Sequence, residues 1–127
     1  MKILLKVEGT ALAATLEDTA VARDFTALLP LELSLEDYAA TEKIAYLPRK
    51  LTTTGAPSST AAAAGDVCYY APWGNLALFY RDSGHAKGLI RLGRLVDRDG
   101  VDALRRPGTL HASIEMAQSP TGRTEDT

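Results

Sequence analysis

Apolar and polar residues alternate along several short stretches of the chain, which is the pattern of β-strands with one face buried and the other in water. The clearest stretches are 3–7, 12–16, 31–35 and 110–116, where every second residue is apolar. Between the first two, Glu8-Gly9 is typical of a two-residue hairpin turn, because glycine accepts a positive φ. The pattern therefore predicts an N-terminal hairpin and two further half-buried strands.

Two stretches have helical spacing instead. The first follows the N-cap residues at 18–19. Its apolar residues fall at i, i+4, i+7 and i+8 and form one stripe, made by Val21, Phe25, Leu28 and Leu29. Pro30 disfavours helical geometry in the residue before it and so predicts the end of this helix. The second candidate, 97–106, is short and ends before Pro107-Gly108.

The middle of the chain predicts four more strands and a tight turn. Residues 43–48 read as a short strand, and 67–71 with 76–81 read as a hairpin around Pro72-Trp73-Gly74-Asn75, whose residues favour a turn. Both faces of the 76–81 strand are largely apolar, so we expect it to be central. Residues 89–96 return as a further strand.

Other segments read as breaks in regular structure. Residues 52–65, rich in Thr, Ala, Gly and Pro, and the polar stretch 83–88 are interpreted as surface loops. Gly93 lies inside a strand and predicts a bulge or a sharp bend. Residues 118–127 are polar, so we expect a flexible tail there.

Together these elements predict a mainly β chain of about eight strands and two short helices. We expect a closed, mostly antiparallel β-barrel over residues 1–117, because closure removes exposed strand edges and the helices can plug the two ends.

Composition narrows the function. The chain has 127 residues, which predicts one domain, and a formal charge of −2, which provides no bulk attraction to nucleic acid or to a membrane surface. The N-terminus lacks a long apolar core, so we expect a cytoplasmic protein. One Cys and two widely separated His residues argue against a disulfide and a metal site, and no cofactor is expected. The sequence leaves open whether the protein forms a homo-oligomer.

Four segments resemble the cyclophilin-like fold, and most closely the small bacterial cyclophilin-like proteins of unassigned function. They are TEKIAYLPRKL at 41–51, GDV at 65–67, YAPWGNLALFY at 70–80 and GLIRLG at 88–93. The resemblance implies a barrel in which an N-terminal hairpin, a helix and a barrel strand precede the Gly-Asp strand, and a second helix and a last strand follow. True cyclophilins catalyse prolyl isomerisation with an Arg, a Gln, aromatic residues and a His. Their Phe-His-Arg and Gln-x-Gly-Asp segments do not occur here, so their catalytic set is not carried over.

The candidate ligand-binding residues lie on and around the aromatic hairpin. Trp73 offers a flat apolar face and Asn75 a donor and an acceptor, but both also suit a turn that caps the core. The full candidate set is Glu42, Tyr46, Arg49, Trp73, Asn75, Tyr80 and Arg81. Tyrosines beside Arg49 or Arg81 suit an anionic or amide ligand, although core packing and solvated arginines are the simpler interpretation. Glu42 is expected to pair with one of the two arginines.

Three function classes follow. The first is a module that binds a small molecule or a peptide without the cyclophilin catalytic set. The second is a peptidyl-prolyl isomerase with a rearranged site, in which Arg49 or Arg81 polarises the peptide bond. The third, a hydrolase or lactam-processing component, rests only on larger enzymes that contain similar barrels. The first class is the prediction taken forward, with no catalytic residue assigned.

Overall fold

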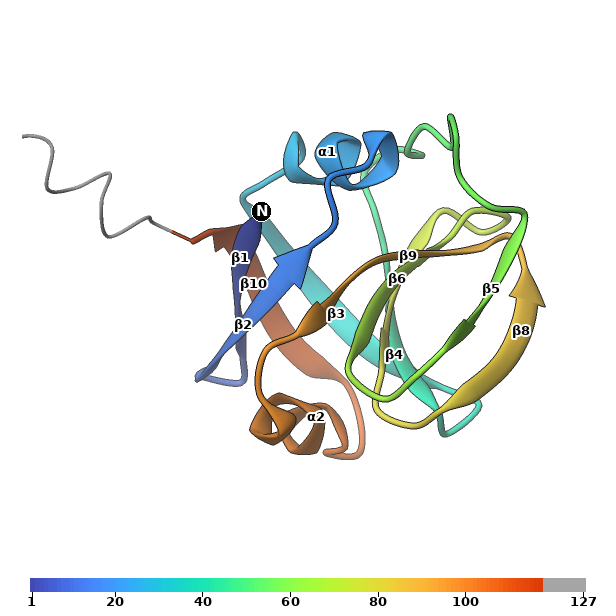
Figure 1. Cartoon of the computed structure of the whole chain (residues 1–127). Helices are drawn as coiled ribbons and strands as arrows, with labels where there is room; N and C mark the ends of the chain where they lie inside the picture. Colours follow the sequence, from blue (N-terminus) through green and yellow to red (C-terminus); the bar gives the residue numbers. More distant parts are fainter. Residues whose placement is uncertain (118–127) are drawn as a thin grey trace, which may run out of the picture.

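A computed structural model describes residues 1–117, except the side chain of Arg98, and its strands close into one antiparallel barrel (Figure 1). Eight strands pair in the order β1-β10-β3-β4-β7-β6-β9-β2. Their bounds are β1 Lys2–Val7, β2 Thr10–Leu16, β3 Leu31–Tyr38, β4 Glu42–Tyr46, β6 Asp66–Tyr70, β7 Asn75–Phe79, β9 Leu89–Leu95 and β10 Leu110–Met116. The predicted mainly β fold, a closed barrel with two short helices, is confirmed. The tail predicted at 118–127 lies outside the described residues.

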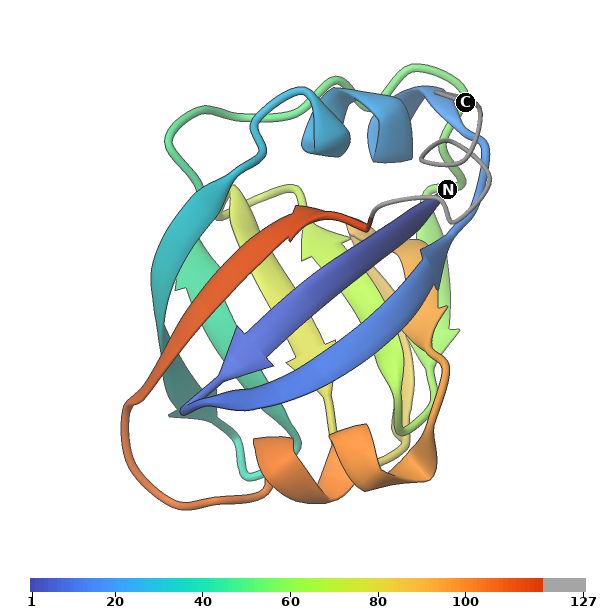
Figure 2. The same cartoon turned by 90° about the vertical axis from the view of Figure 1, so that its left-hand side faces the viewer.

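The two helices cover opposite ends of the barrel, α1 (Ala20–Thr26) at one end and α2 (Arg98–Leu104) at the other (Figure 2). The Thr19 hydroxyl caps α1 by accepting the Ala22 N–H at 3.1 Å. The regular helix ends at Thr26, before the last residues of the predicted apolar stripe, Leu28 and Leu29. Beyond Thr26 the backbone turns more tightly, since the Leu28 N–H donates to the carbonyl of Phe25, three residues back, at 3.0 Å. No helix in residues 1–117 is long and apolar enough to cross a membrane.

The predicted N-terminal hairpin forms as expected. Glu8 (φ 48°) and Gly9 (φ 85°) both adopt positive φ, as a two-residue turn between twisted antiparallel strands requires. The register pairs Leu5 with Leu12 and Ile3 with Ala14, and all four side chains point into the barrel.

Gly93 lies where two strands of the wall approach closely. A Cβ at this position would lie 2.1 Å from the Thr15 carbonyl oxygen, so the close pairing of β9 with β2 requires glycine. The register between β6 and β9 also shifts next to this residue, where Val67 faces Gly93 and Cys68 faces Arg91. This is the bulge that the isolated glycine predicts.

Residues 59–62 and 83–87 correct two predictions. They were expected to be loops, but they form β5 (Ser59–Ala62) and β8 (Ser83–Lys87), a two-stranded ribbon outside the barrel wall. Short stretches of Ala, Gly and Ser have low β-propensity, so the pairing depends on tertiary contacts. The ribbon contributes Ala62 to a second apolar cluster, which it forms with Cys68, Ala77, Phe79 and Leu89 of the outer wall.

The charged side chain of Lys43 points into the barrel. Lys43 is fully buried, and its ammonium donates to the carbonyls of Arg106 at 2.6 Å and Gly108 at 3.0 Å. The same ammonium pairs with the Asp37 carboxylate at 2.8 Å, and the Tyr80 hydroxyl donates to that carboxylate at 2.7 Å. This polar cluster ties the segment between α2 and β10 to β3 and β4.

Candidate functional site

A groove of about 310 Å³ lies on the outer wall of the barrel, between the β3–β4 turn and the β8 strand of the ribbon. We call it the aromatic groove. Its lining residues are Tyr38, Ala39, Thr41, Glu42, Ile44, Tyr70, Trp73, Asn75, Phe79, Ser83, Ala86 and Leu89. This volume is at the lower end of the range of small-molecule sites.

Strand alternation explains why these side chains meet. In β4, Lys43 and Ala45 point into the barrel, so Glu42 and Ile44 point outward. In β7, Leu76 and Leu78 join the barrel core, so Phe79 joins the cluster below the ribbon. The barrel wall therefore presents apolar surface on its outer face, and the ribbon covers only part of it.

Three of the four aromatic residues that line the groove pack against one another. Trp73, in the turn between β6 and β7, packs edge-to-face against Tyr38 and against Tyr70, with ring centroids 5.4 Å apart in both pairs. Trp73 nevertheless stays 46% exposed and Tyr38 44% exposed. Edge-to-face contacts hold the indole in place while nearly half of its surface is open to a ligand.

Glu42 is the one carboxylate that lines the groove. Its only side-chain partner among the described residues is the Thr41 hydroxyl, which donates at 3.1 Å, and it takes part in no ion pair there. Burial without a compensating cation raises the pKa of Glu42 above its ordinary value, and the bond from Thr41 opposes part of that shift. The charged form is therefore poorly stabilised by the protein itself.

Asn75 adds a second acceptor to the groove. It is 1% exposed, and its amide nitrogen donates to the Leu76 carbonyl at 3.1 Å. The side-chain oxygen, Oδ1, accepts no hydrogen bond from the described residues. A buried acceptor without a donor is costly, so this atom is suited to a donor that a ligand brings.

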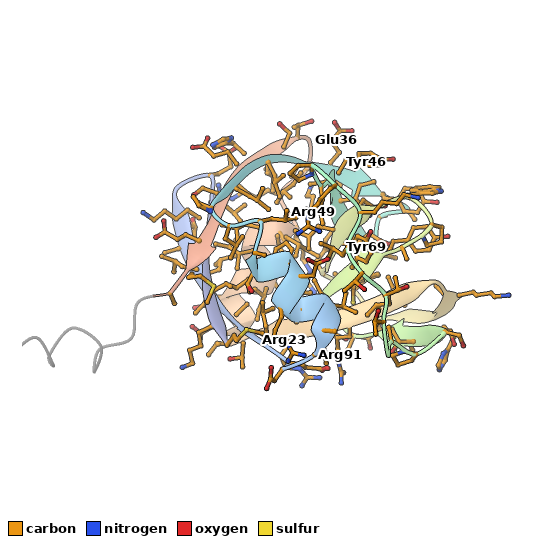
Figure 3. The ribbon with its side chains drawn as sticks, turned by 90° about the horizontal axis from the view of Figure 1, so that it is seen from above. Arg23, Glu36, Tyr46, Arg49, Tyr69 and Arg91 are labelled. Atoms are coloured by element: carbon orange, nitrogen blue, oxygen red, sulfur yellow. The ribbon has the colours of Figure 1, made fainter. Side chains whose placement is uncertain are left out.

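The structure brings together three of the seven candidate residues from the sequence. Glu42, Trp73 and Asn75 line the aromatic groove. Tyr46 lies on the outer face of β4 and is 62% exposed, but it does not line the aromatic groove (Figure 3). Tyr80 points into the barrel, where burial and its bond to Asp37 raise the pKa of its hydroxyl to about 12.

Neither arginine of the candidate set lines the groove. Arg49 lies at the end of the barrel that α1 covers, where its guanidinium donates to both carboxylate oxygens of Asp24, at 3.0 and 2.9 Å (Figure 3). Arg81 is exposed. The expected pairing of Glu42 with one of these arginines is therefore wrong, since Arg49 is held by Asp24 and Arg81 forms no ion pair among the described residues. No arginine therefore joins Tyr38 and Tyr70 in the lining of the groove.

Sequence reasoning missed Tyr38 and Phe79 as lining residues. Tyr38 follows the predicted strand 31–35, and only the extension of β3 to Tyr38 places its ring beside Trp73. Phe79 lies on the outer face of β7, whereas its neighbour Leu78 joins the barrel core. One signal could have identified both residues. The inner face of a closed barrel is filled by one set of apolar side chains, so apolar residues on the other face of a strand must lie on the outer wall.

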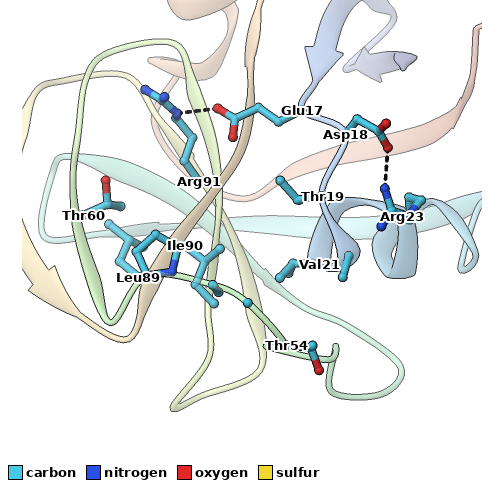
Figure 4. Close-up of a pocket in the computed structure, with 14 residues that line it drawn as sticks. Glu17, Asp18, Thr19, Val21, Arg23, Thr54, Thr60, Leu89, Ile90 and Arg91 are labelled. Atoms are coloured by element: carbon cyan, nitrogen blue, oxygen red, sulfur yellow. Dashed lines mark hydrogen bonds and ion pairs between the residues drawn. The ribbon is translucent and has the colours of Figure 1, made fainter.

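A second cavity, of about 430 Å³, lies between the start of α1, residues 54–57 and β9 (Figure 4). The charges at its rim satisfy each other: Arg91 donates to Glu17 at 2.9 Å, and Arg23 pairs with Asp18. It has no aromatic lining. We therefore place the candidate site in the aromatic groove, whose carboxylate has no cationic partner in residues 1–117.

Comparisons with known proteins agree with this architecture. The profile of the Cyclophilin-like family matches residues 5–115. The solution structure of the hypothetical protein AF2241 from Archaeoglobus fulgidus superposes with a TM-score of 0.62 at 19% identity, covering 92% of this chain and 95% of that one. At this identity the likeness concerns the fold alone. None of the curated proteins compared with the chain matches it.

Proposed function

The chain belongs to the cyclophilin-like family, and we propose that it is a binding protein that holds a small molecule or a short peptide segment in the aromatic groove. The observation that carries this proposal is the half-exposed Trp73, held edge-to-face by two tyrosines above a cavity. Exposed aromatic surface beside a few convergent polar groups is typical of ligand sites.

The arrangement does not favour the alternative, a prolyl isomerase with a rearranged site. That activity would need a guanidinium beside the bound peptide, and no basic residue lines the groove. Arg49 is also engaged in two bonds to Asp24. In a protease-coupled assay with a proline tetrapeptide, we expect no acceleration of cis–trans exchange. Acceleration that Arg81→Ala abolishes would favour the isomerase instead.

Trp73 provides a direct test, because it is the only Trp of the chain. The probes are benzylamine, benzyl alcohol and phenylacetate, which share one ring and differ in charge. We expect a saturable change in tryptophan emission, and a matching rise in the unfolding midpoint, for at least one of them at millimolar concentration.

The thermal rise should disappear in Trp73→Leu. It should persist in Met116→Ala, which removes a similarly exposed apolar side chain outside the groove, 44% exposed against 46% for Trp73. If none of the three probes changes the emission or the midpoint, the proposed function is wrong.

A further inference from the structure

The charge of the aromatic groove has one sign only. Among its lining residues Glu42 is the single carboxylate, and Lys, Arg and His are absent. An anionic ligand would meet an unpaired carboxylate in a partly desolvated site, which costs free energy. If the proposed function is correct, the negative charge of the groove disfavours anionic ligands and favours cationic ones.

Two acceptors in the groove have few or no donors. Glu42 has a single donor, the Thr41 hydroxyl at 3.1 Å. Asn75 Oδ1 is buried and has no donor among the described residues, while the amide nitrogen of Asn75 is already used by the Leu76 carbonyl at 3.1 Å. A ligand that satisfies both sites must bring N–H or O–H donors. An ammonium has several donors and no acceptor.

Apart from the hydroxyl residues Thr41 and Ser83, the rest of the lining is apolar and aromatic. Ile44, Phe79 and Leu89 form apolar walls, and Trp73 exposes nearly half of its surface. Aromatic faces attract organic cations, most strongly when the cation is desolvated, and Trp is the best of them. A small hydrated metal ion would need several oxygen ligands, whereas the groove has one carboxylate.

We infer that the ligand of the aromatic groove is an organic cation, an ammonium group joined to an apolar body. The ammonium pairs with Glu42 and donates to Asn75 Oδ1, and the apolar body packs between Trp73 and the wall formed by Ile44 and Phe79. A free amine and a lysine side chain of a peptide have this chemistry in common.

The test compares ligands of one shape and different charge by tryptophan emission. Benzylamine should bind about 10-fold more tightly than benzyl alcohol, and phenylacetate should bind most weakly. Benzyltrimethylammonium has the same charge but no N–H donor, so its affinity should lie between those of benzylamine and benzyl alcohol. Acetyl-Gly-Lys-Gly-amide against acetyl-Gly-Met-Gly-amide repeats the comparison for a peptide. The inference holds whichever of benzylamine and the lysine peptide binds more tightly. The tighter of the two shows whether a free amine or a peptide lysine is the source of the cation.

Two variants with the same change of charge locate the effect. Glu42→Gln should remove the preference for cations and leave the affinity for benzyl alcohol within about 2-fold. Glu32→Gln, which neutralises an exposed carboxylate on β3 outside the groove, should keep the preference. Benzyl alcohol or phenylacetate binding as tightly as benzylamine would overturn the inference while leaving the proposed function intact. A preference for cations that survives in Glu42→Gln would also overturn the inference. If no probe binds, the inference and the proposed function are both rejected.

Discussion

Replacing Lys43 with Met removes a buried ammonium that points into the barrel and keeps most of the side-chain volume. In the native protein this fully buried group bonds to Asp37 at 2.8 Å and to the carbonyls of Arg106 and Gly108 at 2.6 and 3.0 Å. Breaking a buried ion pair by removing one partner typically costs about 3–5 kcal/mol.

Two features lower that cost here. The Asp37 side chain is 38% exposed, so its carboxylate can be hydrated once the ammonium is gone, and it keeps the bond from the Tyr80 hydroxyl. Arg106 and Gly108 are exposed as residues, so their carbonyls can reach water after a small rearrangement. We therefore expect Lys43→Met to lower the free energy of unfolding by about 2–3 kcal/mol. For a chain of this length that is a fall of about 10 °C in the unfolding midpoint.

The assay is urea unfolding at neutral pH, with Lys6→Met as the matched control, because Lys6 is exposed on β1. The control should stay within about 0.5 kcal/mol of the wild type. The double variant Lys43→Met/Asp37→Asn should be far less destabilised than the sum of the two single variants, since each change removes the same ion pair. A Lys43→Met protein as stable as the control, or additive single effects, would refute the reasoning.

A pH titration of stability adds an independent check on the same cluster. The hydrogen bond from Lys43, and then that from Tyr80, hold the pKa of Asp37 below its ordinary value of 3.8. A lowered pKa of a carboxyl means stability that is fully present above pH 3.8 and is lost as the pH falls through the lower native pKa. The difference in stability between the wild type and Lys43→Met should therefore shrink in acid below pH 3.8. A difference that stays constant down to pH 2 would mean that Asp37 is not the partner that matters.

Three further predictions concern other parts of the fold. Gly93→Ala should cost about 2 kcal/mol or more in urea unfolding, because its Cβ would lie 2.1 Å from the Thr15 carbonyl oxygen; an unchanged midpoint would mean that β2 and β9 separate freely. Glu42→Gln should raise the unfolding midpoint at neutral pH and not in acid, since a raised carboxyl pKa marks a charged form that the fold disfavours; a lower midpoint at neutral pH would contradict this. The Cys68 thiol, whose pKa burial raises strongly, should react with Ellman's reagent only after unfolding, and rapid labelling of the native protein would show that the ribbon opens.

The barrel could be predicted from the sequence because alternation is a local signal. In β1, β2 and β10 every second residue is apolar, and those residues join the barrel core as expected, except Met116 at the end of β10, which is exposed. Thr19 and Pro30 likewise marked the region of α1 correctly, since capping and ring geometry act over only a few residues.

The ribbon and the partners of the charged residues could not be predicted in this way. The β5 and β8 strands consist of residues with weak β-propensity, and they pair because Ala62 and Ala86 pack over Phe79 on the outer wall. Arg49 was a candidate partner of Glu42, but it pairs with Asp24 from α1, 25 positions earlier in the chain. Which acid meets which base depends on how the barrel ends are covered, and spacing along the chain does not reveal that.

The sequence by itself determined the strand pattern, the closed barrel and the aromatic hairpin around Trp73, because each rests on short-range periodicity or turn chemistry. Only the tertiary structure decided what that hairpin faces. In the closed barrel, Lys43 and Tyr80 point inward. Glu42 on β4 and Asn75 on β7 line the same groove as Tyr38 at the end of β3. The charge of a groove is the sum of side chains from distant segments, so its preference for a cation emerges only when the strands are placed side by side.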